Sequence, residues 1–186
     1  QGSDSFKIEK DINNLDYDNK VINLLKKSKK PTVVLGLENL IDDTSEVLSK
    51  ISNILNCPIL VTYKAKGIIP DQDNNLVGIF TGGKAEQISI LESDLIILIG
   101  LDPVELILQP WPYNIPVLNI SLIEHQVHYV NPDVNLFGDL NFNLKKHLQY
   151  FTRSIWKKSE IKYLKDQIKS KLNFPSDNLL NPQSIV

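Results

Sequence analysis

Short segments made almost entirely of apolar residues place the strongest constraint on the fold. Leu95-Ile96-Ile97-Leu98-Ile99 carries no polar side chain, and residues 58–62 and 116–120 carry one each. A strand with one wetted face would alternate apolar and polar residues, so these strands must be covered on both faces. They are also far too short to cross a bilayer. The sequence therefore predicts a buried sheet of parallel strands.

Helical patterns separate these segments along the chain. Asp42, Asp43 and Glu46 are expected in the first turns of one helix, where the helix dipole favours anions. Alternation of strands and helices predicts an open three-layer α/β/α fold with a parallel sheet, of the Rossmann-like type. The expected strands are 32–36, 58–62, 95–100, 116–120 and 134–138, and the expected helices are 17–28, 41–56, 82–91, 144–151 and 154–171.

Length and composition narrow the class of protein. The 186 residues fit one domain with extensions, and the net charge of −2 disfavours a general binder of nucleic acid or acidic membranes. A single cysteine, Cys57, excludes a disulfide framework and a zinc ribbon. Since no signal peptide is visible, a cytoplasmic setting is expected. We predict a tag and linker at 1–16, a domain at 17–152, and a helical linker at 153–186.

Candidate binding residues follow the predicted strands, because open parallel sheets bind ligands at the carboxyl ends of their strands. Three glycines end or follow strands, and a glycine pair precedes a helix whose free amides could hold a phosphate. Each position is also typical of a plain turn, and Asp139 of a helix cap. The predicted cofactor-binding residues are Gly36, Gly82, Gly83, Gly100, Asp102 and Asp139.

Several familiar motifs are missing. After the first strand the chain reads Gly36-Leu37-Glu38-Asn39, with one glycine where a dinucleotide fingerprint has three, and Glu38 would repel a pyrophosphate. His125 and His128 form a weak metal signal, for which surface or packing roles are favoured. No catalytic residue and no metal ligand is predicted. The aromatic stretch 109–113 either packs against another domain or covers the sheet edge.

The order of these signals resembles the central domain of thiamine diphosphate-dependent enzymes of the acetolactate synthase, pyruvate oxidase and oxalyl-CoA decarboxylase type. The resemblance covers roughly residues 17–186. The matching segments are Lys30-Pro31, Cys57-Pro58, Lys66-Gly67-Ile68-Ile69-Pro70-Asp71, Gly78 with Gly82-Gly83, Ser93 to Gly100, Gly138-Asp139, and Asn181-Pro182-Gln183.

The resemblance implies that this chain does not catalyse by itself. In the family, thiamine diphosphate and a divalent metal ion lie between two other domains. One of these domains supplies the activating Glu, and the other supplies a GDG…N motif. The expected metal ion in the parent is Mg. Here Gly138-Asp139-Leu140 stands instead of GDG, and at another place. The expected partners are therefore the pyrimidine-binding and diphosphate-binding domains of a parent that forms dimers or tetramers, whereas the fragment itself is expected to be monomeric.

Central domains of the family bind FAD, ADP or nothing. Leu37-Glu38-Asn39 replaces the glycine-rich turn, Leu101-Asp102-Pro103 stands where an Arg is expected, and Ser121 replaces an Asp. These departures favour a structural crevice over FAD or ADP binding. Two alternatives stay open: a stand-alone nucleotide-binding module of the deoxyhypusine synthase-like fold, and an interaction scaffold.

Overall fold

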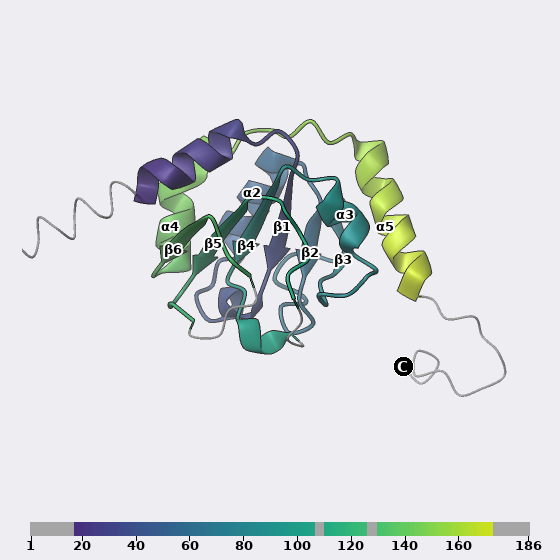
Figure 1. Cartoon of the computed structure of the whole chain (residues 1–186), viewed down its shortest axis with the longest axis horizontal. Helices are drawn as coiled ribbons and strands as arrows, with labels where there is room; N and C mark the ends of the chain where they lie inside the picture. Colours follow the sequence, from purple (N-terminus) through teal and green to yellow (C-terminus); the bar gives the residue numbers. More distant parts are fainter. Residues whose placement is uncertain (1–16, 107–109, 126–129, 173–186) are drawn as a thin grey trace, which may run out of the picture.

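A six-stranded sheet with all strands parallel forms the centre of the chain (Figure 1). The computed structural model describes residues 17–106, 110–125 and 130–172. The strand order is β3-β2-β1-β4-β5-β6, so β1 and β4 are neighbours and the order reverses between them. The strands are β1 (Pro31–Leu35), β2 (Ile59–Val61), β3 (Leu76–Ile79), β4 (Leu95–Ile99), β5 (Val117–Ser121) and β6 (Val134–Phe137).

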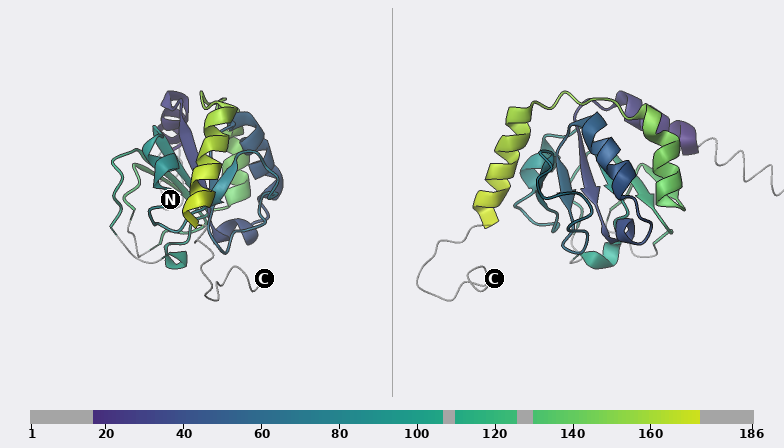
Figure 2. Two further views of the ribbon diagram at one scale, coloured as in Figure 1. Left: turned by 90° about the vertical axis from the view of Figure 1, so that its right-hand side faces the viewer. Right: turned by 180° about the vertical axis from the view of Figure 1, so that it is seen from behind.

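Helices cover both faces of the sheet. The left view of Figure 2 shows α2 and α4 on one face, and α3 with the helix of residues 17–27 on the other. No helix of the described residues is long and apolar enough to span a membrane. The further α-helices are α2 (Ser45–Leu55), α3 (Gln87–Leu91), α4 (Leu140–His147) and α5 (Lys158–Leu172), and the 3-10 helices are η1 (Leu37–Leu40), η2 (Pro103–Glu105) and η3 (Leu148–Tyr150).

The hydrophobic core runs along the central strands. All five residues of β1, β4 and β5 are buried, and in β4 none is more than 2% exposed. Burial of a strand on both faces explains why these segments are apolar throughout. The predicted three-layer fold with a parallel sheet is confirmed.

Several element boundaries differ from the sequence prediction. β3 was not predicted, and the helix expected from residue 41 begins only at Ser45, after η1. Asp43 has a φ of 40°, and the Asp42 carboxylate accepts hydrogen bonds from the first amides of α4 instead of capping its own helix. Gly82 and Gly83 lie in a turn before α3, which begins at Gln87, and α5 begins at Lys158.

α5 stands at the edge of the sheet beside β3, between the two helical layers (Figures 1 and 2). At its beginning, the Trp156 Nε1 donates to the carbonyl oxygen of Pro31 at 2.8 Å, and the Lys30 ammonium lies 3.9 Å from the Trp156 ring centroid. Towards its end, Ile168 packs so closely on Gly78 that a Cβ there would lie 2.7 Å from Ile168 Cγ2. The segment is therefore fixed to β1 just before α5 begins and to the edge strand β3 near the end of α5.

Candidate functional site

The carboxyl ends of β1 and β4 meet without space between them. Gly36 follows β1 and Gly100 follows β4, and the Gly36 amide donates to the Ile99 carbonyl at 2.9 Å. A Cβ on Gly36 would overlap the Gly100 carbonyl oxygen and the Leu101 Cα. Gly100 has a φ of 62°, and a Cβ there would lie 2.7 Å from Asn39 Nδ2. Both glycines therefore let the backbone after β1 approach the backbone after β4 closely, at the point where the strand order reverses.

Asn39 fills the remaining space at this junction. Its buried side-chain amide donates to the carbonyl oxygens of Gly36 at 2.9 Å and Ile99 at 2.7 Å. Its Oδ1 accepts a hydrogen bond from the buried Thr44 hydroxyl at 2.9 Å. The side chain thus pairs the backbone of both strand ends from within the protein.

Glutamate carboxylates accept hydrogen bonds from backbone amides at the carboxyl ends of three strands. The Leu37 amide, after β1, donates to Glu105 at 2.7 Å, and the Leu122 amide, after β5, donates to Glu38 at 2.8 Å. The Gly83 amide, after β3, donates to Glu86 at 2.9 Å. In nucleotide-binding domains, backbone amides at such places donate hydrogen bonds to the phosphate oxygens of the ligand. Here the chain supplies its own anions to them.

Glu38 also binds a histidine. Its carboxylate is buried and lies 2.7 Å from His125 Nε2, while His125 Nδ1 lies 4.0 Å from Asp102 Oδ1. This contact ties the loop after β5 to the loop after β1. The predicted packing role of His125 agrees with this position, and His128 lies outside the described residues.

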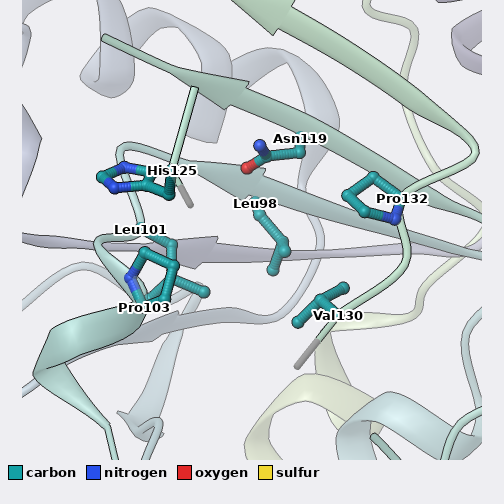
Figure 3. A pocket seen from close by; sticks show the side chains of 7 residues that line it. All are labelled: Leu98, Leu101, Pro103, Asn119, His125, Val130 and Pro132. Atoms are coloured by element: carbon teal, nitrogen blue, oxygen red, sulfur yellow. The ribbon is translucent and has the colours of Figure 1, made fainter. Parts of the chain in front are cut away.

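A small cavity lies beside His125, against Leu98 of β4 and Asn119 of β5. Figure 3 shows His125, Leu101 and Pro103 on one side of it and Val130 with Pro132 on the other. Its volume of about 20 Å³ is room for one water molecule, far below the few hundred Å³ of a ligand pocket.

The six predicted binding residues share the carboxyl edge, but the structure does not bring them all together. Gly36 and Gly100 are in contact, and Asp102 lies beside them at the start of η2. Gly82 and Gly83 follow β3, and Asp139 follows β6, at opposite ends of the sheet. Five strand spacings of about 4.8 Å separate these ends by roughly 24 Å.

The two acidic residues of this set have structural partners. Asp102 accepts from the Val104 amide at 2.9 Å and forms a capping box with Glu105. Asp139 accepts from the Phe142 amide at 2.6 Å and caps α4, as the sequence suggested. Whether the six residues bind a cofactor stays a prediction.

Aromatic rings cover the β3 end of the carboxyl edge. Trp111 lies edge-on to Tyr113, with 4.9 Å between ring centroids, and packs against Phe80. The stretch expected to pack on another domain or on the sheet edge therefore contacts this chain's own sheet end, although Gln109 lies outside the described residues. Burial, with the nearby charge of Glu86, raises the pKa of Tyr113 to about 12.

Two of the side chains that close this edge were missed by sequence reasoning. Glu105 accepts hydrogen bonds from three donors, including the Thr62 hydroxyl at 2.5 Å, and Glu86 binds the turn of Thr81 to Gly83. The spacing Asp102-x-x-Glu105 is that of a capping box and could have identified Glu105. Nothing in the sequence signals the role of Glu86. Within the described ranges, no three His, Cys, Asp or Glu residues gather to hold a metal ion.

Strand order 3-2-1-4-5-6, with a glycine-lined junction at the switch point, defines the class of doubly wound domains that carry nucleotides in other proteins. The family model described as "Thiamine pyrophosphate enzyme, central domain" matches residues 19–147. The chain belongs to this family.

Two curated proteins are similar over most of the chain. One is a "Probable acetolactate synthase large subunit" from Methanococcus aeolicus, 29% identical over 140 residues that make up 70% of this chain. The other is the mouse (Mus musculus) "2-hydroxyacyl-CoA lyase 1", 26% identical over 138 residues, or 72% of the chain. The matched regions are 23% of each relative, so the chain spans about a quarter of their length.

Proposed function

We propose that the chain is a non-catalytic central domain of a larger thiamine diphosphate-dependent enzyme, of the 2-oxo acid decarboxylase or carboligase type. In this role its carboxyl edge is closed to nucleotides and contacts neighbouring domains. Thiamine diphosphate and Mg²⁺ are then held by the flanking domains of the parent chain. The observation that carries the proposal is the pairing of the Leu37, Leu122 and Gly83 amides with the chain's own carboxylates.

The outer surface of the carboxyl edge supports a contact with protein. Five adjacent strands, from β2 to β6 across the sheet, each end at or lead into a loop with an exposed large apolar side chain. Exposed apolar side chains gathered on one surface mark protein interfaces. The residues are Tyr63, Ile41, Val104, Ile123 and Phe137, between 38% and 77% exposed.

The second candidate is a nucleotide-binding module for FAD or ADP. It is favoured by the strand order, which is that of dinucleotide-binding domains. The full gene distinguishes the candidates, because a parent enzyme requires an upstream catalytic Glu and a downstream GDG…N motif. A module without those flanking domains would contradict the first candidate.

Calorimetric titration of FAD and ADP into the purified chain tests the closed edge. We expect no saturable binding, because the Leu37, Leu122 and Gly83 amides already donate to carboxylates of the chain and the Gly36 amide to a backbone carbonyl. A repeat titration into the Glu105→Ala variant, in which the Leu37 amide is released, provides the matched control. Saturable micromolar binding of either nucleotide to the unaltered chain would contradict the proposal.

A further inference from the structure

Another hollow lies along the edge strand β3, between this strand and α5. Its volume is about 430 Å³, within the range of small-ligand sites. Its floor is apolar, formed by the buried Val61 and Ile168 and the half-buried Leu76 and Ile79. We call this the edge groove.

Three lysines form the rim of the edge groove. Lys165 and Lys169 project from successive turns of α5, and Lys66 comes from the segment after β2. Within the described part of the chain, none of the three lysine side chains makes a hydrogen bond or ion pair. The lining includes one carboxylate, Asp71. An apolar floor below unpaired ammonium groups attracts an anion that also carries apolar surface, because nearby low-dielectric walls strengthen the field of the lysines.

The residues that line the groove limit the class of ligand that it can bind. An extended peptide cannot pair along β3, since Ile168 of α5 already packs on Gly78 in the middle of that strand. The lining offers no aromatic ring and no side-chain amide on which a nucleotide base could stack or bond. We propose that the edge groove binds an anionic amphiphile: a carboxylate or phosphate attached to an unbranched apolar chain. The site goes beyond the proposed function and does not depend on it.

Titration of decanoate below its micelle-forming concentration tests the proposal on the whole chain. We expect saturable one-to-one binding, and affinity that rises about fourfold for each methylene from hexanoate to decanoate. Decanol, without the charge, should bind about tenfold more weakly, and decylamine should not bind. Equal affinity across the chain lengths would overturn the proposal, because the apolar floor would then contribute nothing.

Lysine variants locate the binding. Lys165→Gln with Lys169→Gln should weaken decanoate binding about tenfold, as expected for two partly exposed ion pairs. Lys158→Gln with Lys162→Gln makes the same change in charge on α5 outside the groove, and should leave the affinity unchanged. Equal effects of the two double variants would overturn the site.

Vesicles distinguish a bound amphiphile from a membrane surface. Binding of monomeric decanoate, competed by decyl phosphate, supports the groove. Cosedimentation with phosphatidylglycerol vesicles without binding of monomeric decanoate would overturn it, because the lysines would then act as a flat basic surface.

Discussion

The carboxyl edge and the edge groove are two places where glycine lets parts of the molecule approach closely, and they differ in what surrounds the glycine. At Gly36 the neighbour is the backbone just after β4, and the polar groups around it are paired by Asn39 and Glu105. At Gly78 the neighbour is the end of one side chain, and the lysine side chains beside it have no hydrogen-bond or ion-pair partner among the described residues. Backbone amides at the usual ligand position of the fold are therefore paired within the chain, whereas the lysines of the edge groove have no side-chain partner among the described residues.

Alanine at the two glycines should show the largest contrast in stability. Gly36→Ala forces a methyl group into the backbone of Gly100 and Leu101, which cannot rotate away, so a loss of about 3 kcal/mol is expected. Gly78→Ala meets only Ile168 Cγ2, which can move with its side chain, and should lose about 1 kcal/mol. Urea unfolding of both variants measures the difference. Equal losses would remove the distinction between the two regions.

Glu105→Ala should have the next largest effect. The change leaves the amides of Leu37 and Asp102 and the Thr62 hydroxyl without their acceptor, at a cost of about 1–3 kcal/mol. Lys165→Ala, at the groove, removes a charge that pairs with no residue in the described ranges, and the loss should stay within about 0.5 kcal/mol. Chemical denaturation at neutral pH compares them, and a similar small loss for both would show that the carboxylate is not structural.

Tyr113→Phe should have the smallest effect on the free energy of unfolding at neutral pH, and a larger effect above pH 10. The pKa of Tyr113 is raised to about 12 by burial, above the ordinary value of 10. Because the folded state resists ionisation, the tyrosine contributes stability below pH 10 that is lost as the pH rises towards 12. The difference in unfolding free energy between the unaltered chain and the variant should therefore change over this interval. A constant difference would show that the hydroxyl ionises equally in both states.

Apolar runs were sufficient to predict the parallel sheet. Strands that are buried on both faces are apolar throughout, whereas strands with one solvent-exposed face alternate apolar and polar residues. β3 was missed, since its four residues include Gly78 and follow the turn-like Asp73-Asn74-Asn75. The layers of the fold could therefore be predicted from the sequence, whereas the edge strand could not.

The carboxyl edge was predictable in position but not in pairing. Gly36 and Gly100 were recognised as strand ends, yet the contact between them depends on β1 and β4 being neighbours, which no local pattern encodes. Glu38 was expected to repel a pyrophosphate, but its partners lie more than eighty residues away in the chain. Such pairs follow from topology, so they can be identified only once the strand order is known.

The attachment of α5 at both ends has a consequence for the direction of the polypeptide. The fifteen residues of α5, Lys158–Leu172, advance about 22 Å. Trp156, just before the helix, is held at β1, and Ile168, one turn before its end, packs on β3. The packing of α5 on the sheet therefore fixes the direction in which the polypeptide runs at Leu172. A substitution that loosened Ile168 from Gly78 would change that direction even if the sheet stayed intact.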